Sequence, residues 1–385
     1  MSFDKELFLY NFNTKRRRES LEAQTRTREI RLIDVIQRAV QENASDIHIT
    51  SGARPAIRVD GKIKFLSEFP ILTPEATQKL SYSVMSERHR KTLEERGQVD
   101  FSFGVKDIGR FRANVFYQRG SVAAAFRRLP YQIRSVTELG LSEKVLELCH
   151  RKMGLVLVTG PTGSGKSTTL AAMINYINTN FPYHIITIED PVEYVFHHKQ
   201  SIVNQREIDQ DVYSFADALR AALREDPDVI LVGEMRDKET IETALRAAET
   251  GHLVFGTLHT NTAISTITRI VDVFPAEQQE QIRVQLSMTL QGVISQRLLP
   301  KVGGGRVLAY ELLIPNSGIR NLIRENKLQQ IYSLMQSGQL ESGMQTMNQS
   351  LYRLYKAGYI TVDEALRASP DIKELERMLG LSKRA

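Results

Sequence analysis

The sequence is poor in cysteine and has no long apolar run. Its single cysteine is Cys149, which excludes an intramolecular disulfide and a zinc site built on paired cysteines, so a reducing cytoplasm is the simplest compartment. We expect Cys149 to be a small buried apolar residue in a helix that ends near His150. No stretch approaches the ~18–20 apolar residues of a membrane span, and residues 1–10 are too polar for a signal peptide. The sequence therefore predicts a soluble chain that would reach a membrane only through a partner or a surface contact.

The bulk composition is that of an ordinary globular protein. Of 385 residues, 42% are hydrophobic and 25% are charged, and this length favours two or three domains. The net charge of +6 includes one dense basic run at residues 15–18. We interpret residues 1–30 as a solvated, basic polar leader; contact with acidic lipid or nucleic acid is the alternative.

Residues 31–130 are predicted to form a small α+β domain. Apolar residues recur at helical spacing from Arg31 to Val40, and residues 46–50 alternate as a half-buried strand does. Asp60-Gly61 indicates a tight turn between strands at 56–59 and 62–66, and Thr73-Pro74 begins a helix. Further strands are expected at 99–105, 109–118 and 122–129, and residues 131–135 are the predicted linker.

From Val136 the pattern changes to that of a doubly wound α/β domain. Short apolar runs, typical of strands buried on both faces, alternate with helical segments. Strands are predicted at 155–159, 185–188, 229–232 and 254–257, and helices at 167–178, 214–224 and 238–250. This core is assigned to residues 136–300. Beyond residue 275 the chain is predicted to turn helical, with an apolar stripe at Ile282, Leu286, Leu290 and Ile294, and residues 301–385 are predicted as a C-terminal helical region.

A glycine-rich loop follows the first of these strands. Residues 160–167 read Gly-Pro-Thr-Gly-Ser-Gly-Lys-Ser, which matches the phosphate-binding pattern G-x-x-x-x-G-K-[ST] in full, between a strand and a helix. Glycines let backbone N–H groups point at phosphates, and the helix start adds partial positive charge. We predict that ATP and Mg²⁺ bind here, with Lys166 on the β- and γ-phosphates and Ser167 on the metal. The predicted nucleotide-binding residues of the loop are Gly160, Thr162, Gly163, Ser164, Gly165, Lys166, Ser167 and Thr168.

A second motif is an apolar strand that ends in an acid, Asp228 to Glu234. A carboxylate at this end of a strand in a P-loop enzyme is able to orient and deprotonate an attacking water. We predict Glu234 as the general base and as an outer-sphere Mg²⁺ ligand that acts through water. The alternative is a solvated acid paired with Arg236.

Further polar residues follow the neighbouring strands. Glu189, Asp190 and Glu193 come after the strand at 185–188, at the edge where open α/β sheets bind ligands. They suit holding magnesium, positioning water or receiving a neighbour's arginine, and a plain acidic turn is the alternative. His259 follows the strand at 254–257 and is either a sensor of the γ-phosphate or structural.

Arginines lie on the predicted strands of the first domain. Arg110 and Arg112 share one strand face, and Arg127 lies on the next strand. Taken alone they form a solvated or ion-paired face. If this domain adjoins a neighbouring nucleotide site, they become arginine fingers that neutralise charge in the transition state.

Together these segments resemble the motifs of the traffic ATPases of the secretion superfamily. Residues 160–168, 188–193, 233–237 and 256–261 look like that family's Walker A, Asp box, Walker B and His box, in this order. Within it the chain resembles the PilT-type retraction ATPases, through Ala-Ser-Asp-Ile-His-Ile at 44–49 and the segment at 109–119. Residues 318–325 match the C-terminal motif of that subclass, except that Gly318 stands where the subclass has alanine. The resemblance covers about residues 31–370, and the tetracysteine module of the pilus-assembly and type II secretion ATPases is absent.

The resemblance implies an α/β fold with an N-terminal PAS-like domain and a RecA-like ATPase domain followed by C-terminal helices. It implies a homo-oligomer, usually a hexameric ring, with nucleotide between the two domains. The implied function is an ATP-hydrolysing motor for type IV pilus retraction and twitching motility. It also implies Arg112 and Arg127 as arginine fingers and His259 as the residue that couples the phosphate state to domain motion. The residues implied to be catalytic or to line the site are Glu234, Glu193, Arg112, Arg127, His259, Glu189 and Asp190.

Partners and rival functions follow from the same comparison. The implied partners are an inner-membrane pilus platform protein and a PilU-type paralogue, at the inner face of the cytoplasmic membrane. A nucleic-acid motor would need a basic or aromatic channel, for which the leader is the only support, so no nucleic acid is expected. A regulator that binds nucleotide without hydrolysing it is disfavoured by Lys166 and Glu234. A PilU-type protein is disfavoured by the segment at 321–325.

Overall fold

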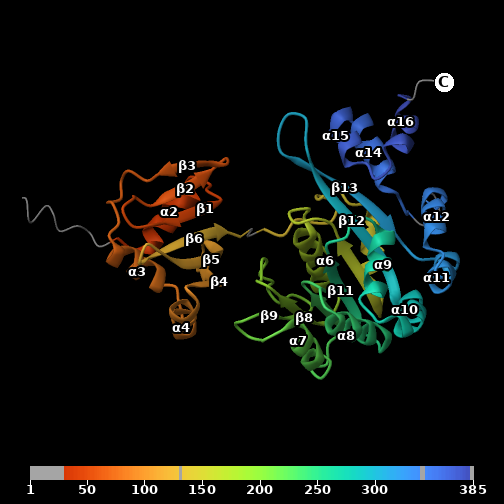
Figure 1. The fold of residues 1–385 in the computed structure, drawn as a ribbon, viewed down its shortest axis with the longest axis horizontal. Helices are drawn as coiled ribbons and strands as arrows, with labels where there is room; N and C mark the ends of the chain where they lie inside the picture. Colours follow the sequence, from red (N-terminus) through yellow and green to blue (C-terminus); the bar gives the residue numbers. More distant parts are fainter. Residues whose placement is uncertain (1–29, 130–131, 339–342, 382–385) are drawn as a thin grey trace, which may run out of the picture. The chain divides into compact units, whose positions relative to one another are not determined.

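The computed structural model describes residues 30–129, 132–338 and 343–381. Its contacts divide the chain into two compact units, one up to Leu129 and one from Pro130 onward (Figure 1). The predicted leader lies, apart from Ile30, outside the described residues. Of the predicted linker, residues 132–135 carry neither helix nor strand.

The N-terminal unit is built on a six-stranded sheet in the order β3-β2-β1-β6-β5-β4, antiparallel throughout. Its strands are β1 (Asp46–Ile49), β2 (Ala56–Val59), β3 (Lys62–Phe65), β4 (Gln98–Val105), β5 (Gly109–Gln118) and β6 (Ser121–Arg128), and its helices are α2 (Leu32–Gln41), α3 (Pro74–Tyr82) and α4 (Glu87–Arg96). The predicted elements of this unit are all present. Helix α3 begins as expected, because the Thr73 hydroxyl accepts a hydrogen bond from the Ala76 N–H at 3.2 Å and Pro74 has no N–H that would need an acceptor.

The C-terminal unit is built on a seven-stranded sheet in the order β13-β12-β7-β11-β10-β8-β9. All neighbouring pairs are parallel except β12 and β13. The strands are β7 (Gly154–Thr159), β8 (His184–Glu189), β9 (Ile202–Glu207), β10 (Val229–Val232), β11 (Leu253–Leu258), β12 (Leu290–Pro300) and β13 (Arg306–Leu313). Because β7, β8, β10 and β11 run the same way, their carboxyl ends meet at one edge of the sheet.

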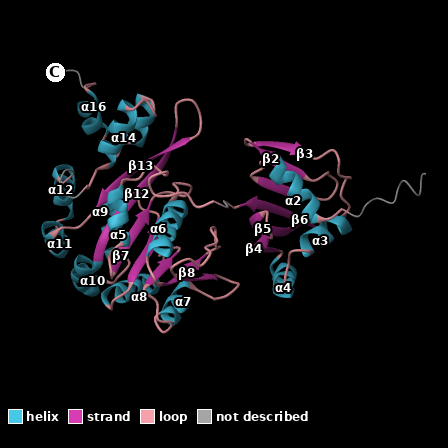
Figure 2. Cartoon of the chain, turned by 180° about the vertical axis from the view of Figure 1, so that it is seen from behind, coloured by secondary structure: helices cyan, strands magenta, loops and turns pink. Residues whose placement is uncertain are grey.

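Helices cover both faces of this sheet (Figure 2). One apolar core packs α5 (Leu146–Cys149) and α6 (Lys166–Asn180) against one face. A second core packs helices on the other face, namely α7 (Phe215–Ala222), α8 (Lys238–Glu249), α9 (Ala263–Asp272), α10 (Ala276–Thr289), α11 (Ser317–Arg324) and α12 (Ile331–Ser337). A smaller core joins β12 and β13 to α14 (Met347–Lys356), α15 (Val362–Ala368) and α16 (Ile372–Leu379). The sheet is therefore buried on both sides, as its apolar strands require.

The structure corrects the prediction for the chain after residue 275. The apolar stripe was expected to be one helix, but α10 ends at Thr289 and Leu290–Pro300 form strand β12 beside β7. The region assigned to helices from residue 301 begins with another strand, β13. Strand β9 at Ile202–Glu207 was not predicted. A spacing of four residues fits a helix, but it is also a multiple of the two-residue period of a strand, so the stripe suits both structures.

Two further predictions concern the burial of Cys149 and the lack of a membrane-spanning segment. Cys149 is fully buried at the end of α5 and carries a free thiol, as expected. Among the described residues, no helix combines the length and the apolar character needed to cross a bilayer.

Candidate functional site

The glycine-rich loop connects β7 to α6 and is held against β12. Gly160 has a φ of 140°, and a Cβ added to it would lie 2.4 Å from the Gln296 carbonyl oxygen, so only glycine allows this close approach. Lys166 lies across the loop, because its Nζ donates to the carbonyl oxygens of Gly160 at 2.8 Å and Pro161 at 3.2 Å. A phosphate oxygen bound in the loop would take the place of these two carbonyl oxygens as the acceptor for Lys166 Nζ.

The loop residues fit a bound phosphate chain. Helix α6 begins after Gly165, whose φ is 91°, and no side chain caps its first N–H groups. Such an uncapped helix start is an anion site, because its N–H groups and its dipole both favour negative charge. Within the described residues, the buried Ser164 hydroxyl also has no hydrogen-bond partner. Burial lowers the pKa of Lys166, although the charges of Glu234 and Glu193 oppose the shift.

Glu234 lies at the end of β10, where three strand ends are tied together. The Gly233 N–H donates to Ile188 at 2.7 Å, the Thr257 hydroxyl donates to the Gly233 carbonyl at 2.5 Å, and the Met235 N–H donates to Thr257 at 3.0 Å. These bonds fix the backbone on both sides of Glu234. The predicted carboxylate is therefore placed by β8, β10 and β11 together.

The Glu234 carboxylate contacts two cationic or polar partners. His259 Nε2 lies 2.9 Å from Oε1, and Arg236 Nε donates to the same oxygen. Oε2 accepts no hydrogen bond from any described residue. Burial alone would raise the pKa of Glu234, but the hydrogen bond and charge of Arg236, with those of His259, bring it below its usual value. The pairing with Arg236 is thus present, but Glu234 is also partly buried and joined to His259.

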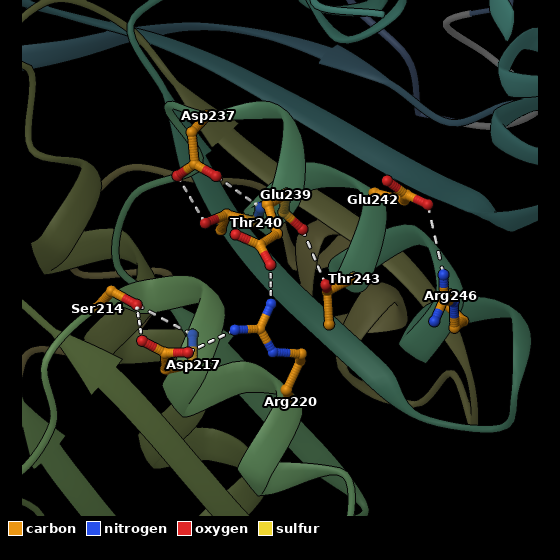
Figure 3. A network of polar contacts seen from close by, with 9 residues as sticks. All are labelled: Ser214, Asp217, Arg220, Asp237, Glu239, Thr240, Glu242, Thr243 and Arg246. Atoms are coloured by element: carbon orange, nitrogen blue, oxygen red, sulfur yellow. Dashed lines mark hydrogen bonds and ion pairs between the residues drawn. The ribbon is translucent and has the colours of Figure 1, made fainter.

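The segment after Glu234 is anchored by the start of helix α8 (Figure 3). The Asp237 carboxylate caps α8, accepting from the Thr240 N–H at 2.8 Å and the Thr240 hydroxyl at 2.7 Å. Arg220 on α7 bridges Asp217 and Glu239, so it joins α7 to the first turn of α8. The segment 233–237 is therefore held at its C-terminal end by the Asp237 cap of α8, which limits how far Glu234 can move.

The acidic residues after β8 differ in environment. Glu189 accepts hydrogen bonds from Thr187 at 2.7 Å and Gln205 at 3.2 Å, but burial outweighs them and raises the pKa of Glu189 to about 7. Glu193 is partly buried, and its charge acts on both Lys166 and Glu189. Asp190 is exposed at the turn. The structure brings Glu193, Glu234 and His259 to the same edge as Lys166.

Arg112 and Arg127 belong to the N-terminal unit. They are directly opposite each other on β5 and β6. Arg127 Nε donates to Asp46 at 3.0 Å, whereas the exposed Arg112 makes no hydrogen bond or ion pair within the described part of the chain. The two predicted finger residues therefore form one basic pair on the sheet.

Several polar contacts of the loop were not predicted. Thr168 on α6 is 2.9 Å from the Tyr194 hydroxyl, which links the loop helix to the acidic segment. On the other side, Thr159 is 2.8 Å from Ser295, and Gln296 donates to Thr169 at 2.6 Å. Ser295 and Gln296 lie on β12. Recognition of this strand would have indicated these residues, because a strand paired with β7 must run past the loop.

A parallel sheet with a phosphate loop after β7 and a carboxylate at the end of β10 defines a P-loop nucleoside triphosphatase. The comparisons with known proteins narrow this class. The model of the family "Type II/IV secretion system protein" matches residues 22–304. The chain belongs to this family.

Individual relatives agree with this assignment. The chain is 50% identical over 334 residues to the type IV pilus retraction ATPase PilT of Pseudomonas aeruginosa, covering 87% of this chain and 96% of that protein. It is 41% identical over 343 residues to the type IV pilus ATPase PilU of the same organism, covering 89% of each. A crystal structure of the pilus retraction motor PilT with bound ADP is 73% identical to this chain and superposes with a TM-score of 0.87. The match covers 91% of this chain and 100% of the PilT chain.

Three predictions are confirmed by these relatives: the resemblance to PilT-type ATPases, the ATPase class and the function in pilus retraction. The mixed α/β fold is likewise confirmed, and so is a nucleotide as ligand of the family, since ADP is bound in the related structure. The assignments of single residues remain predictions.

Proposed function

We propose that this chain is the subunit of a homohexameric ring that hydrolyses MgATP. In this proposal each hydrolysis drives a movement of the two units of the chain. That movement retracts type IV pili and so produces twitching motility. In this proposal the N-terminal unit is PAS-like, residues 136–300 form the RecA-like core and residues 301–385 complete it. One observation carries the proposal: Lys166, Glu234 and His259 meet at the carboxyl edge of the parallel sheet.

The phosphate loop holds the triphosphate in this proposal. The backbone N–H groups at the start of α6 and the Lys166 ammonium bind the phosphate oxygens, exchanging the loop carbonyls for the substrate. Mg²⁺ would be held by the Ser167 hydroxyl and, through water, by Glu234, and it would supply positive charge to the phosphates. Thr168 is held beside Tyr194 and lines the same site.

Glu234 acts as the general base. Its lowered pKa keeps it ionised at neutral pH, so it is ready to accept a proton from water. Arg236 and His259 both contact Oε1, which leaves Oε2 as the atom that faces the attacking water. His259 thereby links the γ-phosphate side of the site to β11 and to the segment that follows it.

The remaining site residues surround this centre. Glu193 is near enough for its charge to act on Lys166, and we assign it to the catalytic group, with Glu189 and Asp190 lining the nucleotide site. Arg112 and Arg127 serve as arginine fingers. The absence of a described partner for Arg112 supports this role, because a finger must be free to reach a phosphate.

The proposed partners are further copies of this chain, an inner-membrane pilus platform protein and a PilU-type paralogue. PilU is itself a relative of this chain. The proposed location is cytoplasmic, at the inner face of the cytoplasmic membrane beneath the pilus. No nucleic acid partner is proposed.

Phosphate release with MgATP tests the proposal. We expect the wild type to turn over as a ring on gel filtration, Glu234→Gln to bind ATP with a kcat reduced by roughly 10²–10⁴-fold, and Lys166→Ala to lose ATP binding. Hydrolysis by Glu234→Gln at the wild-type rate would remove its role as base. A wild type that binds ATP and never hydrolyses it as a ring would refute the motor and favour a regulator.

A further inference from the structure

Glu311 on β13 is a buried acid that the proposed chemistry does not use. It is 2% exposed. Its Oε1 accepts a hydrogen bond from the Ala263 N–H at 2.6 Å, and the Met347 N–H lies close enough to the carboxylate to lower its pKa. Ala263 is the first residue of α9 and Met347 is the first residue of α14. One carboxylate is therefore shared by two helix N-termini.

The capping of both helices explains why this acid is needed. Thr262 with Ser265, and Thr346 with Gln349, form capping boxes. A capping box satisfies the N–H groups of the N-cap and of the third helical residue, and it leaves the N–H of the first helical residue without a partner. At α9 the N–H of that first residue donates to Glu311, and at α14 it adjoins the same carboxylate. A negative charge is also favourable at the positive end of each helix dipole.

The two helices belong to different parts of the C-terminal unit. Helix α9 follows directly on residues 256–262, the segment that carries His259. Helix α14 begins the C-terminal helices α14–α16. Arg297 on β12 adds positive charge next to Glu311, and it lines a pocket of about 390 Å³ between the tip of the phosphate loop and α15. The other lining residues of that pocket include Thr162, Asn261, Glu364 and Arg367.

We propose that Glu311 is a positioning residue that couples the nucleotide site to the C-terminal helices. A displacement of residues 256–262 moves the N-terminus of α9, and the shared carboxylate transmits it to the N-terminus of α14. The pocket beside α15 provides room for the helices to shift relative to the loop. This inference rests on the proposed function, because it assigns the signal to the nucleotide bound at Lys166.

Glu311→Gln is the variant that tests the coupling. Glutamine has the same shape, but it is neutral and has one acceptor oxygen and two donor hydrogens, so it offers no negative charge to the two helix N-termini and places a donor where the carboxylate had an acceptor. The fold is expected to survive, because β13 is also joined to the start of α14 through the backbone. Leu312 on β13 and Gln345, which directly precedes the N-cap Thr346, exchange two backbone hydrogen bonds of 2.9 and 3.1 Å. Glu374→Gln is the matched control. Glu374 accepts hydrogen bonds from Tyr332, Gln336 and Asn348 within the C-terminal helices, and in the described part of the chain its carboxylate has no hydrogen bond to α9.

Hydrogen–deuterium exchange of the full chain, with and without a non-hydrolysable ATP analogue, measures the coupling. In the wild type we expect the analogue to slow exchange in residues 160–180 and to change it in residues 346–368. Glu311→Gln should keep the first effect and lose the second, with a kcat lowered roughly tenfold and a KM for ATP near the wild-type value. Glu374→Gln should keep both effects.

Each other outcome contradicts the inference. An unchanged response of residues 346–368 in Glu311→Gln, or no response there in the wild type, would show that Glu311 transmits nothing. Loss of the response in Glu374→Gln as well would assign it to general loosening of the helices. If the wild type shows no protection at residues 160–180, nucleotide binding itself fails, and the proposed function falls together with the coupling.

Discussion

Replacing Gly160 by alanine tests the argument that the phosphate loop requires glycine where it meets β12. With a φ of 140°, alanine would occupy a backbone region that costs about 1–3 kcal/mol. The added Cβ would also lie 2.4 Å from the Gln296 carbonyl oxygen and 2.6 Å from Ser164 Oγ, and such overpacking costs about 1–3 kcal/mol more. We therefore expect Gly160→Ala to lower the free energy of unfolding by about 2–6 kcal/mol.

Gly163→Ala in the same loop is the matched control. Gly163 has a φ of 80°, and a Cβ there would meet nothing within 4 Å, so only the left-handed backbone is penalised, by about 1–2 kcal/mol. Urea denaturation without nucleotide, followed by circular dichroism, measures both losses, and titration with a fluorescent ADP measures binding. Equal destabilisation of the two variants, or wild-type ADP binding by Gly160→Ala, would refute the close-approach argument.

Three further predictions concern the C-terminal unit. Because burial raises the pKa of Glu189 from 4.5 to about 7, the folded state holds this proton more tightly than the unfolded state, and stability should fall as the pH rises from about 4.5 to about 7, by up to ~3 kcal/mol. Glu189→Gln should remove this contribution and so make the pH dependence less steep in urea titrations at a series of pH values, and an unchanged slope would contradict the assignment. Arg320→Gln should lower the free energy of unfolding by about 1–3 kcal/mol, because Arg320 donates to two of the last carbonyls of α10, Ser287 at 2.7 Å and Met288 at 3.1 Å. The exposed Arg324 is the control, and Arg324→Gln should change the free energy of unfolding by less than about 0.5 kcal/mol. Gly318→Ala should raise the free energy of unfolding by about 0.5–1 kcal/mol, since its Cβ would make only ordinary contacts, at 3.4 Å from Asn316 Oδ1 and 3.7 Å from Leu334, and a lower melting temperature would refute this.

The strands that carry the motifs were predictable because each is a continuous apolar run followed at once by polar residues. Strands β7, β8, β10 and β11 are buried along most or all of their length, so their sequences contain little besides branched and apolar side chains. A parallel arrangement then brings their carboxyl ends together. For this reason the proximity of Glu234 and His259, which follow different strands, could be expected from the sequence.

Strands β9 and β12 lack this local signal, for opposite reasons. Strand β9 is at the sheet edge, and of its apolar residues Val203 is buried while Ile202 is exposed. Strand β12 continues the four-residue spacing of α10, so Leu290 and Ile294 extend an apparent helix face into a strand. The contacts of Thr168 with Tyr194 and of Glu311 with two helix starts join residues far apart in the chain, and no periodicity encodes such pairs.

Strand β12 connects the segment at 318–325 to the phosphate loop, although the two lie far apart in the chain. Arg320, within the segment at 318–325, holds the end of α10, which leads directly into β12. Further along the same strand, Ser295 contacts Thr159 and Gln296 bonds to Thr169 on α6. A displaced α10 end would therefore shift the strand that flanks the loop. The segment at 318–325 and the phosphate loop are thus joined through one continuous strand, and we expect Arg320→Gln to alter the steady-state rate of ATP hydrolysis.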